Sequence, residues 1–149
     1  MTKDNQAAAP VISSAGALVN GLKVIGAKRI ALVAPYMKPL TQLVVDYIQH
    51  EGIEVKVWHA LEIPDNLEVG RHDPARLPGI VAEMDLREVD AIVLSACVQM
   101  PSLPAVPTVE AQTGKPVITA AIATTYAMLT ALELEPIVPG AGALLSGAY

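Results

Sequence analysis

The chain has 149 residues, of which 52% are hydrophobic and 17% are charged. This length suits one domain with a proper core and is too short for two ordinary domains, so we expect a single domain over residues 1–149. A net charge of −5 and an aromatic content of 3% provide neither the basic stripe nor the stacking rings of a nucleic-acid-binding protein. We therefore exclude nucleic acid as a partner.

The chain contains one cysteine, which cannot form an internal disulfide. No charged and then apolar leader with a small-residue cleavage site opens the sequence, so a cytoplasmic location is the simplest interpretation. The longest uncharged apolar stretch that could be helical, residues 117–132, is too short for a bilayer span and contains four threonines. We predict a free thiol and no membrane partner.

Short apolar runs and helical spacings alternate along the chain. The apolar runs predict four strands, over residues 29–34, 53–58, 90–96 and 115–120. Apolar residues three and four positions apart predict five helices, over residues 15–22, 40–48, 77–84, 105–113 and 124–132. This alternation is typical of an α/β domain with a four-stranded parallel sheet flanked by helices on both faces. The alternating polarity of the second strand places it nearer the sheet edge.

Cys97 directly follows the third predicted strand. In open α/β sheets the carboxyl ends of the strands carry the ligand crevice, so a thiol there is placed for chemistry. The small residues Ser95 and Ala96 leave room for a ligand to approach. Free cysteine is also among the most buried residue types, and an ordinary core thiol explains the position equally well.

Main-chain N–H groups after this strand could bind an anion such as a carboxylate. Together with the positive end of the helix that follows, they would also activate the thiol. Prolines 101 and 104 lack N–H groups, so such a site depends chiefly on Cys97, Val98 and Gln99.

Polar residues also follow the first two strands. Tyr36 comes directly after the first strand, where it either packs or donates its O–H at the mouth of the crevice. Asp65 and Asn66 lie in a predicted loop over residues 61–67, where such residues commonly form turns, although the asparagine amide could bind a carboxylate.

Other common types of site find no support in the sequence. The three histidines, His50, His59 and His72, share no metal-ligand spacing, so we assign no metal. Neither a glycine-rich phosphate loop nor a serine nucleophile elbow is present, which disfavours nucleotide binding and serine catalysis. We expect no cofactor.

Residues 136–149 carry no charge. An exposed segment is normally polar, so one this apolar is expected to dock against a second surface, either another subunit or a domain absent from the chain.

Three blocks of sequence carry a family likeness over residues 10–149. They are Val33-Ala-Pro-Tyr-Met-Lys-Pro-Leu40, Val93-Leu-Ser-Ala-Cys-Val-Gln-Met-Pro-Ser-Leu-Pro-Ala105 and Pro139-Gly-Ala-Gly-Ala-Leu-Leu-Ser-Gly147. Together they resemble the maleate cis–trans isomerases, a family of the Asp/Glu racemase superfamily. The resemblance implies an enzyme of two halves related by pseudo-twofold symmetry, of which this chain matches the C-terminal half.

The resemblance also implies a mechanism without cofactor or metal. In this family a cysteine from the N-terminal half adds to the double bond of maleate, and the resulting thioether can rotate about its central bond to yield fumarate. Cys97 matches the second cysteine, the acid–base partner. Tyr36 and Asn66 match residues that hold the dicarboxylate, and the N–H groups of Cys97 and Val98 match carboxylate donors. The resemblance further implies a role in the catabolism of nicotinate in the cytoplasm.

Because the nucleophilic cysteine of the family has no counterpart in this sequence, we expect the chain to be inactive alone. Its partner would be the missing N-terminal half or a second copy. Two alternatives remain. One is a cofactor-free decarboxylase of the same superfamily in which Cys97 alone donates the proton, and the other is a non-catalytic dicarboxylate-binding module.

Overall fold

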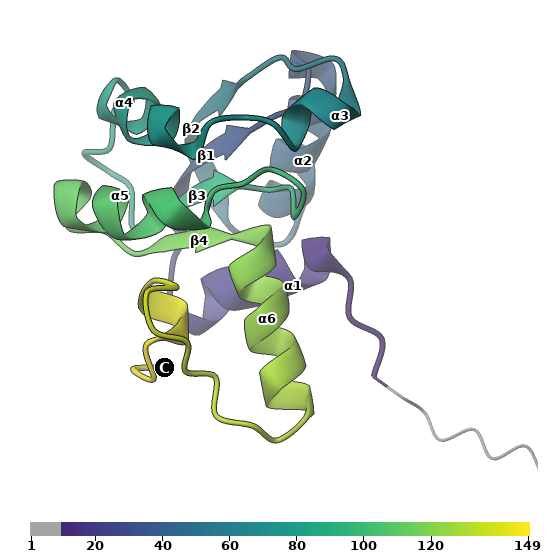
Figure 1. Ribbon diagram of the computed structural model, residues 1–149, viewed down its shortest axis with the longest axis vertical. Coiled ribbons are helices and arrows are strands. Elements are labelled where there is room, and N and C mark those ends of the chain that lie inside the picture. The colour runs from purple at the N-terminus through teal and green to yellow at the C-terminus, as the bar shows by residue number, and fades with distance from the viewer. Residues whose placement is uncertain (1–9) are drawn as a thin grey trace, which may run out of the picture.

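The computed structural model describes residues 10–149 and confirms the expected α/β fold. All strand pairs of its four-stranded sheet are parallel, and the strand order is β2-β1-β3-β4 (Figure 1). The strands are β1 (Arg29–Ala34), β2 (Glu54–Ala60), β3 (Ala91–Ser95) and β4 (Val117–Thr119).

Helices cover both faces of this sheet. They are α1 (Ser14–Val24), α2 (Lys38–His50), α3 (Asn66–Val69), α4 (Leu77–Ala82), α5 (Val106–Thr113) and α6 (Ala120–Ala131). The long helices α1 and α6 pack against each other, and α4 packs against α5 (Figure 1). Three short 3-10 turns complete the order, at Pro74–Arg76, Leu103–Ala105 and Ala143–Leu145. Within residues 10–149 no helix is long and apolar enough to cross a membrane.

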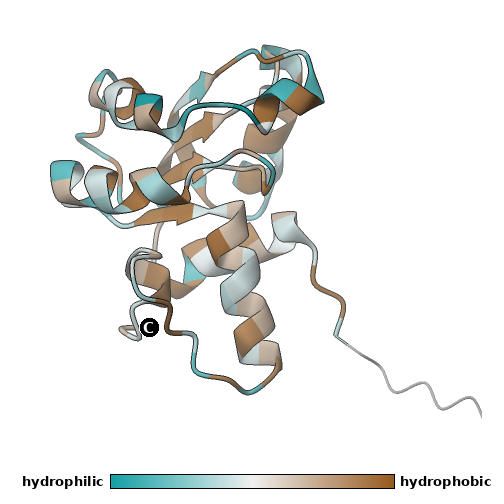
Figure 2. Cartoon of the chain, in the orientation of Figure 1, coloured by the Kyte–Doolittle hydropathy of each residue, from teal (hydrophilic) through white to brown (hydrophobic). Residues whose placement is uncertain are grey.

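The hydrophobic core follows the two central strands. Every residue of β3 and all but the first of β1 are buried, as expected of strands covered on both faces. The strands are accordingly almost continuously hydrophobic in Figure 2. The strand β2 alternates between exposed and buried positions, and its place at the edge of the sheet confirms the prediction from its alternating polarity.

Capping side chains explain where several elements begin. Asp73 accepts a hydrogen bond from the Ala75 N–H at 2.9 Å and starts the 3-10 turn that leads into α4. The last helix begins at Ala120, four residues before the predicted start, because the Thr119 hydroxyl caps the N–H of Ile122. The predicted loop over residues 61–67 is also partly wrong, since its end enters the one-turn helix α3.

Part of the apolar C-terminal segment docks on its own chain, and the expectation that the segment also covers a second surface stays a prediction. Leu144 and Leu145 are buried in the main core. The Glu110 carboxylate accepts hydrogen bonds from the N–H groups of Val117, at 3.0 Å, and Ala143, at 2.9 Å, and so joins the segment to the start of β4. Its large apolar side chains at Ile137 and Tyr149 remain half exposed.

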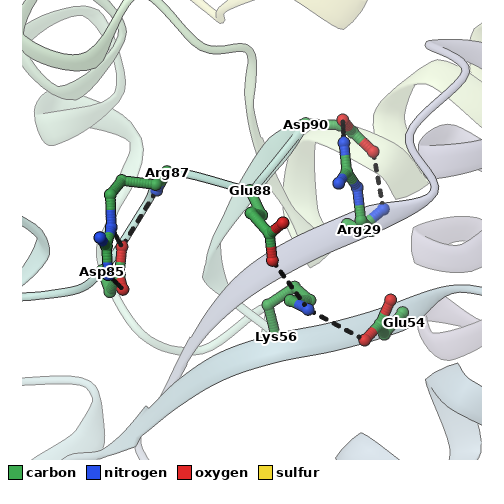
Figure 3. Close-up of polar contacts among 7 residues, drawn as sticks. All are labelled: Arg29, Glu54, Lys56, Asp85, Arg87, Glu88 and Asp90. Atoms are coloured by element: carbon green, nitrogen blue, oxygen red, sulfur yellow. Dashed lines mark hydrogen bonds and ion pairs between the residues drawn. The ribbon is translucent and has the colours of Figure 1, made fainter.

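Charged side chains gather at the amino ends of the strands (Figure 3). Asp90 accepts hydrogen bonds from the main-chain N–H of Lys28, at 3.1 Å, and of Arg29, at 2.8 Å, and it also pairs with the Arg29 guanidinium. Lys56 lies between Glu54 and Glu88. This cluster joins the start of β1 to the segment before β3, at the amino ends of the strands and so at the end of the sheet opposite Cys97.

We expect Asp90→Ala to lower the free energy of unfolding by about 1–2 kcal/mol, a value reduced by partial solvent exposure. The pKa of Asp90 is lowered, chiefly by the hydrogen bond from the Arg29 side chain. Its stabilising contribution is therefore complete above the ordinary carboxyl pKa of about 4 and is lost as the pH falls through the lowered value. Urea unfolding of both proteins between pH 7 and pH 2 should show the difference shrinking with acidity, and a constant difference would contradict the prediction.

Candidate active site

The strand order places a crevice between the carboxyl ends of β1 and β3. From β1 the chain crosses to β2 on one side, and from β3 it crosses to β4 on the other, so the direction in which strands are added reverses between β1 and β3. Ligands of open α/β sheets bind at such a switch point. Tyr36 follows β1 and Cys97 follows β3, and the fold therefore brings these two predicted residues to the same crevice.

A tight turn holds Cys97 at the end of β3. The buried Ser95 hydroxyl donates to the Cys97 carbonyl oxygen at 2.7 Å and accepts from the Cys97 N–H at 3.1 Å. The Gln99 N–H points at the Cys97 sulfur at 3.4 Å. Cys97 itself is partly buried. The thiol is thus neither a fully buried core group nor a freely rotating surface group.

The turn changes which N–H groups could meet an anion. The N–H of Cys97 bonds to Ser95 and that of Gln99 faces the sulfur. Val98 is the member of the trio whose N–H has no hydrogen-bond partner among residues 10–149. Helical structure begins at Leu103, and the expected contribution of this helix end to the site stays a prediction. A carboxylate bound here would meet Val98 first.

Tyr36 lies partly buried beside Cys97. Its pKa is raised above the ordinary value, first by burial and then by the polar interaction with the Cys97 side chain. The phenol therefore remains protonated near neutral pH and can only donate to an anionic partner. Its main chain is fixed as well, since its carbonyl oxygen accepts from the buried Thr41 hydroxyl at 3.2 Å.

Asn66 begins the one-turn helix α3, and its side chain is exposed. The preceding Asp65 accepts from the Leu67 N–H at 2.8 Å, which confirms the turn-forming interpretation of Asp65. The Gln99 amide donates to the main-chain oxygen of Asn66 at 2.6 Å and joins α3 to the Cys97 loop. The Asn66 loop and the Cys97 loop therefore meet.

The sequence predictions omitted two contributions to this arrangement. The capping role of Ser95 has a recognisable signal, because a serine two residues before a turn position often bonds to the local backbone. The side-chain role of Gln99 has no local signal, since its partner, Asn66, is 33 positions away in the chain.

Two open cavities of about 280 Å³ each flank the Cys97 turn. One includes Val98 and is bordered by α6 and the C-terminal segment. The other includes Ala96 and Tyr36 and lies between α1 and α2. Within the described part of the chain no three histidine, cysteine or acidic side chains gather in a way that could hold a metal ion. The arrangement offers a thiol, a protonated phenol and an unpaired N–H.

A family model described as arylmalonate decarboxylase matches residues 2–145. Among curated proteins, a maleate isomerase from Pseudomonas putida is 78% identical over 148 residues, which cover 99% of this chain and 59% of that protein. The chain thus spans about three-fifths of the length of this relative.

Solved structures show the same partial coverage. A Pseudomonas putida maleate isomerase variant with maleate superposes with a TM-score of 0.95 at 67% identity, covering 98% of this chain and 58% of the other. A serine variant of the Nocardia farcinica maleate cis–trans isomerase, with a covalently bound succinylcysteine intermediate, superposes with a TM-score of 0.88 at 50% identity. That match covers 92% of this chain and 56% of the other.

Proposed function

Because the chain belongs to the arylmalonate decarboxylase family, we propose that it is the C-terminal part of a maleate cis–trans isomerase of that family. The observation that carries this proposal is the 78% identity to a maleate isomerase over nearly the whole chain. The reaction converts maleate to fumarate in the cytoplasm without a cofactor.

Isomerisation requires that the double bond of maleate become single for a time. A cysteine thiolate supplied by the missing part of the enzyme adds to one olefinic carbon, and Cys97 delivers a proton to the other. The product is a succinyl thioether, the kind of intermediate covalently bound in the Nocardia farcinica structure. After rotation about the central bond, the Cys97 thiolate removes the proton and the first thiolate leaves, which yields fumarate.

The remaining residues of the crevice bind the two carboxylates. Tyr36 donates its O–H, and its raised pKa keeps that proton in place at neutral pH. The Val98 N–H and the Asn66 amide supply further donors. The Cys97 N–H, which donates to the Ser95 hydroxyl, contributes by donating to the substrate carboxylate at the same time. Neutral donors of this kind hold an anion without competing for the proton that Cys97 transfers.

The proposal includes the incompleteness of the chain. It spans 59% of the length of its Pseudomonas putida relative and contains a single cysteine. One thiol cannot add to a carbon and also protonate its neighbour from a separate position. The activity therefore requires the missing part, which supplies the second thiol and covers the exposed residues of the crevice.

A decarboxylase is the second candidate, because the matching family model is described by that activity. In that reaction loss of carbon dioxide leaves an enolate-like carbanion, which Cys97 alone could protonate. The 78% identity to a maleate isomerase over 148 residues favours isomerisation.

Joining the chain to the complementary segment of the Pseudomonas putida relative tests the proposal. We expect the joined protein to convert maleate to fumarate, seen in the olefinic proton NMR signals, and the 149-residue chain to give no fumarate. The complete relative is the positive control.

Each other result rejects a stated part of the proposal. Turnover by the 149-residue chain would overturn its incompleteness. Release of carbon dioxide from an aryl malonate, without isomerisation, would support the decarboxylase instead. Maleate binding without turnover by the joined protein would indicate a binding module.

A further inference from the structure

We propose that Gln99 is a positioning residue that holds the Asn66 turn in register with Cys97, an inference that rests on the function proposed above. Its main chain and its side chain contact different parts of the site. The N–H of Gln99 faces the Cys97 sulfur at 3.4 Å, and its amide nitrogen donates to the Asn66 carbonyl oxygen at 2.6 Å. One residue thereby sets the relation between the proton carrier and a substrate-binding turn.

The local structure of α3 leaves this carbonyl available. In a regular helix the N–H of residue 70 would donate to the oxygen of Asn66 four positions earlier. Here the Gly70 N–H donates to the Glu68 oxygen instead. Gln99 takes the place of the missing helical donor, so the end of the β3 loop completes the first turn of α3 from outside.

This bond is expected to limit where the Asn66 side chain lies. The helix α3 has only four residues, and Asn66 and Leu67 are exposed, so its own packing supplies little restraint at that end. A short helix in water is unstable without tertiary contacts. Loss of the Gln99 bond should therefore release Asn66 while leaving Cys97 held by Ser95 and by the Gln99 main chain.

The test compares four variants of the joined protein described above. Gln99→Glu keeps the shape of the side chain but replaces the donor by an oxygen that repels the Asn66 carbonyl. Gln99→Met keeps the length and removes the polarity, and Gln99→Lys restores a donor. Gly70→Ala is the matched control. The added carbon would lie 3.6 Å from the Leu67 carbonyl oxygen and 3.7 Å from the Gln99 amide nitrogen, both ordinary contact distances, so the Gln99 bond should persist.

We expect the KM for maleate to rise about tenfold in Gln99→Glu, less in Gln99→Met and least in Gln99→Lys, with kcat changed less than about threefold. Gly70→Ala should retain the parental KM. A purely steric role predicts instead that the glutamate variant resembles the parent. A parental KM in Gln99→Glu, or a loss confined to kcat, would overturn the inference.

Amide hydrogen exchange in the 149-residue chain separates this inference from the proposed function. We expect the amides of residues 67–70 to exchange several-fold faster in Gln99→Glu and at the parental rate in Gly70→Ala. If the joined protein fails to isomerise maleate but this difference is seen, the proposed isomerase function is wrong and the positioning role of Gln99 still holds. Equal exchange in Gln99→Glu and the parent contradicts the positioning role of Gln99, whether or not the joined protein isomerises maleate.

Discussion

Replacing Cys97 with serine in the joined protein is expected to lower kcat for maleate about 10²–10⁴-fold, the usual contribution of a general acid–base group. The serine hydroxyl is too weak an acid to give up its proton at neutral pH, but its oxygen can still accept from the Gln99 N–H that faces the sulfur. Proton NMR of the maleate-to-fumarate conversion measures the loss.

The same substitution should leave substrate binding and folding nearly unchanged. The Ser95 hydroxyl bonds to the main chain of residue 97 and not to its side chain, so the turn persists. Maleate affinity and urea unfolding of the serine variant are the controls. Normal turnover by a folded Cys97→Ser protein would reject the acid–base role of this residue.

Replacing Gly142 with alanine is expected to lower the free energy of unfolding by about 2–6 kcal/mol. Gly142 has φ +82° and ψ −178°, a conformation essentially limited to glycine that costs other residues about 1–3 kcal/mol. An added methyl would also lie 2.8 Å from Val106 Cγ1 and 3.2 Å from both the Glu110 carboxylate and the Val117 oxygen, and overpacking of this kind costs about 1–3 kcal/mol more. Urea unfolding at neutral pH measures the change.

Gly140 provides the matched control, two residues earlier in the same segment. Its φ is also positive, at +76°, but an added methyl would meet nothing within 4 Å. Gly140→Ala should therefore show only the backbone cost of about 1–2 kcal/mol. Equal destabilisation by the two substitutions would mean that the contacts of Gly142 with α5 and β4 contribute nothing.

The residues of these two predictions, Cys97 and Gly142, lie near the same cavity. Leu145 lines the cavity beside Val98, and Ala141 lines it as well, so the C-terminal segment forms part of the wall next to the Cys97 turn. Glu110 anchors that segment to β4. We therefore expect the segment to support the shape of the site although it carries no proposed catalytic group.

Much of the site follows from local sequence patterns. The apolar runs that end at Ala34 and Ala96 identify two central strands, and residues just past such strands must lie at one edge of a parallel sheet. That argument places Tyr36 and Cys97 at the same end of the sheet, whereas their choice as site residues rests on the family likeness. The likeness to maleate isomerases, read from three short blocks, is upheld by the 78% identity to one of them, whereas the roles of the individual residues stay predictions.

The element types and the approximate position of the site were determined by the sequence, because hydrophobic periodicity and turn residues act over a few positions. Cys97 could be placed at a strand end in this way. Only the tertiary structure decided that the Cys97 N–H is taken by Ser95, that Gln99 reaches Asn66, and that the apolar C-terminal segment covers its own chain. The last two depend on contacts between residues distant in sequence, and the first on a choice among local hydrogen bonds that only the folded backbone makes.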